Sequence, residues 1–352
     1  MAGYYFRLPA ITQLTIPQQA ALGEPNQIAL SGGPGTGKSV VSLWRHIRNY
    51  QKHPVPITSS FLLTFTTTLK VYLAACCRTV QEEDYPNAWK YASQNVGTSL
   101  KNSHRIHNTR YTEVIIDEAQ DLANDYYTGI VSPVSYGADD SQILYPNHCS
   151  YQEELKAIFP NNLSYVLDKN FRSTQKIMQF AKQAFPNANI PVSIIQGLSD
   201  NVGEIPVLLI SNGINEKQNK AIERIINSFR AEDQNIAILV PLQSDVRTFE
   251  TILINEGFKK NVDFSSYCNN DYNETGGCNN LLNIHITTFK SVKGLEFDTV
   301  IIPNFHNYIS TSLRVINWQD YYVACTRARS NLYLISNFNL PQLSTVTEIE
   351  HL

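Results

Sequence analysis

The sequence predicts an α/β protein made of two successive domains, each a parallel sheet flanked by helices. Short apolar runs alternate with amphipathic helical patterns, and this alternation occurs before and again after about residue 165. In addition, 352 residues with 43% hydrophobic content suffice for two cores of ordinary size. We therefore expect one domain over residues 1–165 and a second over residues 166–352.

The first half of the chain supplies three expected strands, each with a helical pattern or a polar turn after it. The strands are QIAL (27–30), FLLTF (61–65) and EVII (113–116). Helices are expected from about Lys38 and from about Thr68, and residues of about 70–110 leave room for a small insertion. This order of elements predicts a parallel sheet, because parallel strands need helical crossovers.

The second half repeats the pattern. Expected strands are IPVLLI (205–210), NIAILV (235–240), NIHITTF (283–289) and DTVIIP (298–303), with helices near 216–230 and 244–256. The polar tract CNNDYNETGGCNN (268–280) has turn composition throughout, which predicts a mobile loop.

Charge and cysteine content limit the class of protein. A net charge of −3 gives no overall basic field, so a nucleic-acid contact would need a local groove. The six cysteines are scattered without C-x-x-C spacing, which indicates reduced thiols and no zinc framework. The start of the chain lacks a signal-peptide pattern, and no segment approaches the roughly 18 apolar residues of a membrane span. We expect a cytoplasmic protein with no membrane partner.

The stretch ALSGGPGTGKSVVSL (29–43) fits the pattern G-x-x-x-x-G-K-[ST] between a strand and a helix. In such a loop backbone N–H groups cradle phosphates, Lys38 reaches the β- and γ-phosphate oxygens, and the Ser39 hydroxyl holds Mg²⁺. A glycine-rich surface turn is the alternative, which the strand, lysine, serine and helix together disfavour. The predicted nucleotide-binding residues are Gly32, Gly33, Pro34, Gly35, Thr36, Gly37, Lys38, Ser39 and Val40.

A second carboxylate site is expected on a neighbouring strand, where it would hold Mg²⁺ and position the attacking water. EVIIDEAQD (113–121) supplies it directly after an apolar strand. Asp117 is the predicted Mg²⁺ ligand and Glu118 the predicted general base. An acidic strand end of no function is credible alone but not beside the phosphate loop.

DEAQD downstream of a P-loop resembles motif II of the UvrD/Rep-type superfamily 1A helicases. Further stretches resemble that family's remaining motifs in their order: LTIPQQAAL, LLTFTTTLK, ADDSQILY, KNFRST, TTFKSVKGLEF and YYVACTRARSNLYLI. The resemblance implies two tandem RecA-like P-loop domains with ATP in the cleft between them. ATP and Mg²⁺ are the implied cofactors.

The resemblance also implies roles for single residues around ATP. Gln18 would read the adenine, Phe171 would lie under it, and Glu296 would lie near the ribose. Gln142 would lie near the γ-phosphate, with Arg172 and Arg327 as arginine fingers.

For nucleic acid, the resemblance implies a single strand held by stacking and phosphate contacts. Its implied contacts are Phe65, Thr66, Tyr145, Lys290 and Lys293. A further cluster, His104, Arg105, His107 and Arg110, either extends the phosphate track or is a solvated face, and we favour the solvated face.

Three departures from the family pattern bear on function. The intervals between motifs are too short for the family's large accessory insertions. Asn147 and His148 stand where the family has tryptophan and arginine. Lys290 stands where the family usually has a histidine. These departures weaken the case for processive unwinding and leave the ATPase residues intact.

We therefore predict an Mg²⁺-dependent ATPase stimulated by single-stranded DNA, or alternatively RNA, that acts as a translocase or limited helicase. The rival hypothesis is a nucleotide-driven switch that recruits a partner protein such as a nuclease without unwinding. An RNA-directed enzyme of the other superfamily 1 branch is a third reading, which NFRST and KGLEF disfavour.

Overall fold

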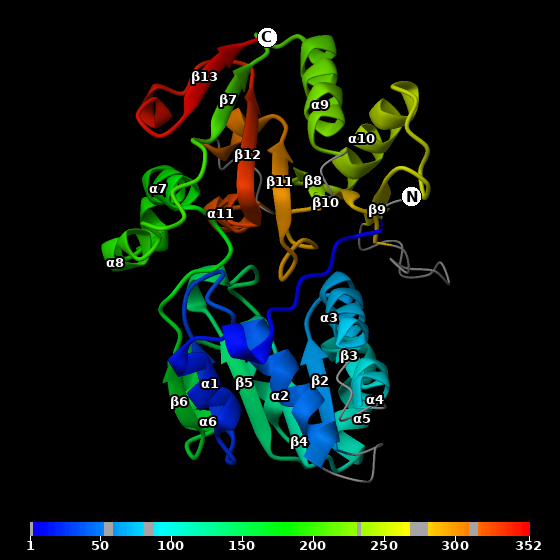
Figure 1. Ribbon diagram of the computed structural model, residues 1–352, viewed down its shortest axis with the longest axis vertical. Coiled ribbons are helices and arrows are strands. Elements are labelled where there is room, and N and C mark those ends of the chain that lie inside the picture. The colour runs from blue at the N-terminus through cyan, green and yellow to red at the C-terminus, as the bar shows by residue number, and fades with distance from the viewer. Residues whose placement is uncertain (1–2, 53–58, 81–87, 231–233, 268–280, 310–315) are drawn as a thin grey trace. The chain divides into compact units, whose positions relative to one another are not determined.

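The computed structural model describes residues 3–52, 59–80, 88–230, 234–267, 281–309 and 316–352 (Figure 1). The chain forms two compact units. We call Phe6–Phe171 the N-terminal unit, and Met1–Tyr5 together with Arg172–Leu352 the C-terminal unit. The tract 268–280, predicted to be a mobile loop, lies outside the described residues.

The N-terminal unit contains a parallel sheet of strand order β3-β2-β4-β5-β1-β6. Its strands are β1 (Ile28–Ser31), β2 (Ser60–Thr64), β3 (Val96–Thr98), β4 (Glu113–Ile116), β5 (Val134–Ala138) and β6 (Leu163–Val166). Its helices are α1 (Ile16–Gly23), α2 (Lys38–Lys52), α3 (Thr67–Thr79), α4 (Ala88–Gln94), α5 (Ser99–Asn108) and α6 (Gln152–Ile158). Because the strands run parallel, the segments that follow them meet at one edge of the sheet.

The central strands β2 and β4 of this sheet are fully buried because both faces of the sheet are covered. All five residues of β2 and all four of β4 are buried. On one face, Phe61, Leu63, Val114 and Ile116 form a continuous core with residues of the helices and loops. Strand β6 is the exception: it is an edge strand, and its residues are largely exposed.

The C-terminal unit contains a second parallel sheet, of strand order β13-β7-β12-β11-β8-β10-β9. Its strands are β7 (Val207–Ile210), β8 (Ile236–Val240), β9 (Ser265–Tyr267), β10 (Ile284–Thr288), β11 (Phe297–Ile302), β12 (Ala328–Ser336) and β13 (Glu348–His351). Its helices are α7 (Gln175–Ala184), α8 (Val192–Gln196), α9 (Asn215–Phe229), α10 (Gln243–Asn255) and α11 (Trp318–Cys325).

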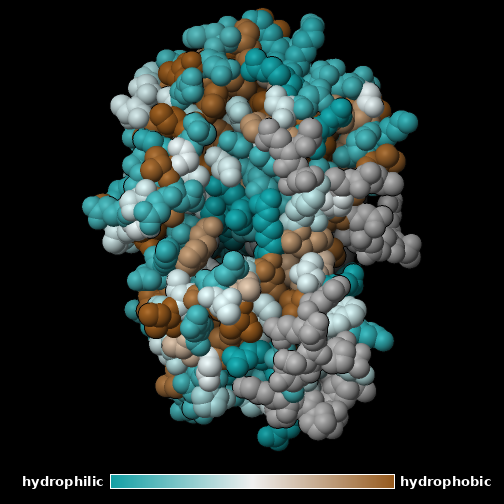
Figure 2. Space-filling view, in the orientation of Figure 1, coloured by the Kyte–Doolittle hydropathy of each residue, from teal (hydrophilic) through white to brown (hydrophobic). Residues whose placement is uncertain are grey.

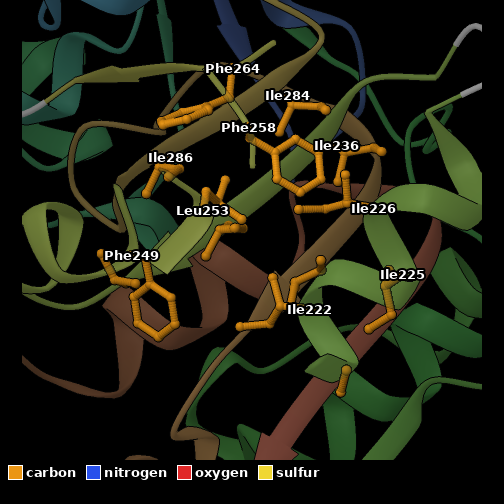
Figure 3. Close-up of a cluster of buried hydrophobic side chains, with 14 of the residues drawn as sticks. Ile222, Ile225, Ile226, Ile236, Phe249, Leu253, Phe258, Phe264, Ile284 and Ile286 are labelled. Carbon is orange, nitrogen blue, oxygen red and sulfur yellow. The ribbon is translucent and has the colours of Figure 1, made fainter. Parts of the chain in front are cut away.

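Helices α9 and α10 close the core on one face of this sheet. Figure 3 shows Ile222 and Ile226 of α9, Leu253 of α10, Ile236 of β8 and Ile286 of β10 in one hydrophobic cluster. Burial of aliphatic side chains of this size contributes about 1.5–3 kcal/mol each. Helices α7 and α11 pack against each other and against β12.

The predicted fold class is confirmed: both sheets are parallel and flanked by helices, as tandem RecA-like domains require. The expected strands correspond to β1, β2, β4, β7, β8, β10 and β11. The elements not expected include β5, whose sequence VSYGA carries a serine and a glycine and no apolar run. Its position between β4 and β1 makes it a strand, because both neighbours supply backbone hydrogen bonds.

No helix within the described ranges is long and apolar enough to cross a membrane. In the face shown in Figure 2, hydrophobic residues are scattered among hydrophilic ones. Single exposed apolar side chains of this kind are normal for a protein surface.

Candidate nucleotide and nucleic-acid sites

The P-loop has a backbone that only glycine permits at its first position. Gly32 has φ of +145°, and a Cβ atom there would lie 2.2 Å from the carbonyl oxygen of Leu167. Gly37, with φ of +87°, ends the loop, and α2 begins at Lys38. The predicted Ser39 and Val40 then fall in the first turn of α2 and are half-buried. The loop therefore presents backbone N–H groups at a helix N-terminus, the arrangement that binds phosphate.

Lys38 folds back over this loop. Its Nζ donates to the carbonyl oxygens of Gly32, at 2.6 Å, and Gly33, at 3.1 Å, and lies 3.7 Å from Oδ2 of Asp139. The Thr36 hydroxyl donates to the same Gly33 oxygen at 2.9 Å. A buried ammonium satisfied by carbonyl oxygens can exchange these partners for phosphate oxygens without loss of hydrogen bonds.

The two motif II carboxylates follow β4. A Cβ atom on Gly137 of β5 would lie 3.5 Å from Oδ1 of Asp117 and 3.6 Å from Cβ of Lys38, so both residues lie beside this glycine. Glu118 has φ of +59° and ψ of +45°, a left-handed conformation that is rare for glutamate. Such backbone strain clusters at functional sites.

Asp139 and Gln120 are site residues that we did not single out from the sequence. Gln142 donates from Nε2 to Oδ2 of Asp139 at 2.5 Å, and the Asp139 N–H donates to Oε1 of Gln120 at 3.1 Å. Gln120 in turn donates to Oε2 of Glu118 at 2.6 Å. The chain of contacts thus runs from Lys38 to the predicted general base. Both residues lie inside segments that resemble family motifs, which is the signal that could have found them.

The residues present fit a nucleotide phosphate with Mg²⁺. Ser39 and Asp117 offer a hydroxyl and a carboxylate, the hard oxygen ligands that Mg²⁺ prefers. Among the residues that the structure describes, no three His, Cys, Asp or Glu side chains are grouped to hold a metal ion. A cation held by few protein ligands and by substrate phosphates requires no such group.

Gln18, the predicted adenine reader, is buried beside the P-loop. Its Nε2 donates to the carbonyl oxygen of Thr36 at 2.9 Å, and its Oε1 accepts from the N–H of Thr15, at 2.9 Å, at the start of α1. This arrangement ties α1 to the P-loop. Contact with an adenine would require the amide to exchange at least one of these partners.

Asn170 is a third residue that we did not single out. Its Nδ2 donates to the carbonyl oxygen of Pro34 at 2.9 Å, and the N–H of Phe171 donates to the carbonyl oxygen of Gly35 at 2.9 Å. The Phe171 ring is 40% exposed, with Nζ of Lys169 5.4 Å from its centroid. The predicted adenine platform therefore lies beside the P-loop and is partly exposed.

Arg172 and Glu296 are paired within the C-terminal unit. Nε of Arg172 lies 3.2 Å from Oε2 of Glu296, and Arg329 binds the other carboxylate oxygen. Burial would raise the pKa of Glu296, but Arg329 and Arg172 hold it below its ordinary value of 4.5. Glu296 is therefore a carboxylate shared by two guanidinium groups.

Two further predicted cations are buried. Arg327 has no exposed surface, and its Nε donates to the carbonyl oxygen of Val323 at 3.0 Å. Lys293 is only 1% exposed. A direct contact of either group with a phosphate would require the side chain or its surroundings to move.

The predicted stacking residues lie together. The ring centroids of Phe65 and Tyr145 are 5.4 Å apart, and both rings are half-buried. Phe65 follows β2, and Thr66 caps α3 by accepting the Leu69 N–H at 3.1 Å. The two aromatic residues thus form one apolar surface from two separate motifs.

The remaining predicted contacts differ in environment. Lys290 is half-buried near Asp320; burial raises the pKa of Asp320 to about 6, and the Lys290 charge opposes part of this rise.

In the basic cluster, the guanidinium of Arg105 lies over Phe61, at 4.9 Å from the ring centroid, and Arg110 is exposed. Arg105 therefore packs against the core instead of forming part of a phosphate track.

Comparison with known proteins finds similarity to helicases. Residues 269–339 match the model of the UvrD-like helicase C-terminal domain. A protein of Acanthamoeba polyphaga mimivirus, provisionally named an ATP-dependent DNA helicase, is 26% identical over 246 residues, which cover 64% of this chain. The match covers 34% of that relative, so the chain spans about a third of its length.

Among solved structures, the C-terminal domain of a possible DNA helicase from Lactobacillus plantarum is 20% identical, with a TM-score of 0.36 over 51% of this chain and 98% of that one. The PRRSV helicase is 14% identical, with a TM-score of 0.43 over 92% of this chain and 54% of that one. The motifs, the matched C-terminal region and the curated relative are all similar to UvrD/Rep-type superfamily 1 helicases.

Proposed function

We propose that this protein hydrolyses ATP with Mg²⁺, is stimulated by single-stranded nucleic acid, and uses the cycle to translocate or to unwind short duplexes. One observation carries the proposal. Lys38, Asp117 and Asp139 follow β1, β4 and β5, three adjacent parallel strands, and Lys38 lies 3.7 Å from Asp139. Ligands of open α/β sheets bind at this edge.

In this proposal the N-terminal unit supplies the phosphate site. Backbone N–H groups of Gly35 and Gly37 and the ammonium of Lys38 bind phosphate oxygens, and Ser39 and Asp117 hold Mg²⁺. Mg²⁺ held by Ser39 and Asp117 would help to neutralise the negative charge that develops on the transferring phosphate. Glu118 accepts a proton from the attacking water, and Gln120 fixes its carboxylate by the 2.6 Å hydrogen bond.

The proposed role of Arg172 and Arg327 is to stabilise charge on the transferring phosphoryl group. Arginine fingers of this kind contribute roughly 10³ to 10⁵ in rate. Arg172 is held by Glu296, and Arg327 by the Val323 carbonyl oxygen. These contacts describe the two guanidinium groups without bound nucleotide. In the proposed cycle, both guanidinium groups exchange these partners for phosphate oxygens.

The proposed polymer is single-stranded DNA, with RNA as the alternative. Bases stack on the surface formed by Phe65 and Tyr145, whose centroids are 5.4 Å apart. Stacking on aromatic side chains contributes about 1–3 kcal/mol per base and tolerates any sequence. Thr66 and Lys290 are the proposed phosphate contacts.

A second function is favoured by the departure from the family pattern after Tyr145. Asn147 and His148, where the family has tryptophan and arginine, are exposed and offer neither a large stacking surface nor a fixed cation. A chain with a weak grip on the strand suits a nucleotide-driven switch that recruits a partner protein such as a nuclease.

Steady-state ATP hydrolysis tests the proposal, with no nucleic acid, with single-stranded DNA, with single-stranded RNA and with duplex. Lys38→Ala is expected to abolish turnover, and Lys156→Ala, an exposed lysine on α6, to leave it unchanged. Salt-sensitive stimulation by single strands supports a motor. Hydrolysis indifferent to every polymer supports the switch, and wild-type protein without hydrolysis contradicts both.

A further inference from the structure

The segment Gly3–Tyr5 is bound to the C-terminal unit. Gly3 forms an antiparallel bridge with Leu282, and the Tyr4 N–H donates to the carbonyl oxygen of Leu281 at 3.1 Å. Tyr5 exchanges two hydrogen bonds with the Asn235 side chain, at 2.9 and 3.0 Å. Nothing in the family resemblance assigns a role to this segment, which precedes the first motif.

The Tyr4 side chain is anchored at the start of β11. It is 4% exposed, and its ring meets that of Phe297 edge to face, with centroids 5.6 Å apart. Its hydroxyl donates to the main-chain carbonyl oxygen of Glu296. Tyr4 therefore fixes the peptide from which the Glu296 side chain extends.

The Glu296 carboxylate binds both Arg172 and Arg329. A second series of contacts runs from Tyr5 through Asn235 to Arg329. The Asn235 N–H donates to Oδ2 of Asp298 at 2.9 Å, and Oδ1 of Asp298 lies 3.9 Å from Nε of Arg329. The position of Arg172 thus depends on a carboxylate whose backbone is held by Tyr4.

Tyr4 and Arg172 also lie beside the two points where the chain passes between its units, after Tyr5 and after Phe171. At each of these two points, therefore, a neighbouring residue contacts Glu296. Tyr4 contacts its main-chain carbonyl oxygen, and Arg172 contacts its carboxylate. We infer that Tyr4 is a positioning residue for the Glu296–Arg172 pair, and that it sets the starting position of the proposed arginine finger. This inference rests on the proposed function for its effect on turnover.

Tyr4→Phe tests the inference, because it removes the bond to Glu296 and keeps the ring. Tyr50→Phe is the matched control: Tyr50 is 7% exposed, and its hydroxyl donates to the Ser60 carbonyl oxygen, at 2.5 Å, in the N-terminal unit. Loss of a single neutral hydrogen bond changes a rate or equilibrium constant by about threefold to tenfold. We expect Tyr4→Phe to lower kcat for ATP by that factor with KM changed less than twofold, and Tyr50→Phe to leave both constants unchanged.

A double variant separates positioning from general destabilisation. In Glu296→Gln protein the carboxylate charge that binds Arg172 is absent, so adding Tyr4→Phe should lower kcat no further. Independent, multiplicative losses from the two substitutions would overturn the inference, as would wild-type kcat in Tyr4→Phe.

An NMR measurement of the Arg172 side chain tests its positioning without relying on ATP hydrolysis. The Arg172 Nε–H resonance, assigned by its loss in Arg172→Lys, is expected to shift and to exchange faster with water in Tyr4→Phe, but not in Tyr50→Phe. An unchanged resonance overturns the inference. Wild-type protein without ATPase activity, but with a shifted resonance, would reject the proposed function and leave the positioning of Arg172 intact.

Discussion

The rings of Phe65 and Tyr145 lie with centroids 5.4 Å apart and planes inclined by 45°. One follows β2, and the other follows the short helical turn Asp140–Gln142 after β5. The sheet brings them together because parallel strands direct their following segments to one edge. Both rings are half-buried, so part of each ring is accessible to solvent.

Phe65→Ala is expected to weaken stimulation by single strands more than basal hydrolysis, because it removes a stacking surface of about 1–3 kcal/mol per base. The measurement is the strand concentration that gives half-maximal ATPase stimulation. Tyr151→Ala, which removes an exposed aromatic side chain of the same unit, should not change this concentration. Equal loss of basal and stimulated turnover would make Phe65 a core residue alone.

Arg172→Ala and Arg327→Ala are each expected to preserve ATP binding and to lower turnover by roughly 10³ or more, because fingers act on the transition state. Arg172→Lys should recover little, since an ammonium lacks the planar fork of a guanidinium. Titration with a fluorescent ATP analogue and steady-state kinetics separate the two effects. Arg224→Ala, an exposed residue paired with Glu350, is the control. Full turnover in Arg327→Ala would reject its assignment.

Asn170→Ala is expected to raise KM for ATP by about threefold to tenfold, because the P-loop loses the hydrogen bond that holds the Pro34 carbonyl group. Asn162→Ala is a matched control. Its Nδ2 donates to the carbonyl oxygens of Ile28, at 3.2 Å, and Val134, at 2.9 Å, at the other end of strands β1 and β5. That change should lower the free energy of unfolding and leave KM unaltered. A KM for ATP in Asn170→Ala equal to that in the Asn162→Ala control would contradict a role for Asn170 in nucleotide binding.

Burial lowers the pKa of His46 to about 4. Because the unfolded chain binds a proton near pH 6.5 and the folded chain does not, His46 contributes stability above pH 6.5 that is lost as pH falls toward 4. Between pH 7.5 and 5 we expect a loss of about 2 kcal/mol from this residue.

Urea unfolding at the two pH values tests this. His46→Gln should flatten the pH dependence of the free energy of unfolding, whereas His351→Gln, exposed on β13, should not. A pH dependence identical to wild type in His46→Gln would show that the pKa of His46 is the same in the folded and the unfolded chain.

The residues that the structure adds to the site were not singled out from sequence for a common reason. Asp139, Gln120, Asn170 and Tyr4 contact residues that are distant in the chain, such as Lys38 and Glu296. A hydrogen bond between distant segments leaves no periodicity in either one. Similarly, β5 and β6 lack strong strand patterns and become strands because β1 and β4 pair with them.

The sequence by itself determined the two α/β units, the P-loop and its Lys38, and the carboxylates after β4. Each depends on local pattern: apolar runs that must be buried, and glycines that permit φ values closed to other residues. Only the tertiary structure decided that Lys38 meets Asp139, that Phe65 meets Tyr145, and that Glu296 joins Arg172, Arg329 and Tyr4. Such pairings follow from strand order and crossover direction, which bring distant segments to one edge of a sheet.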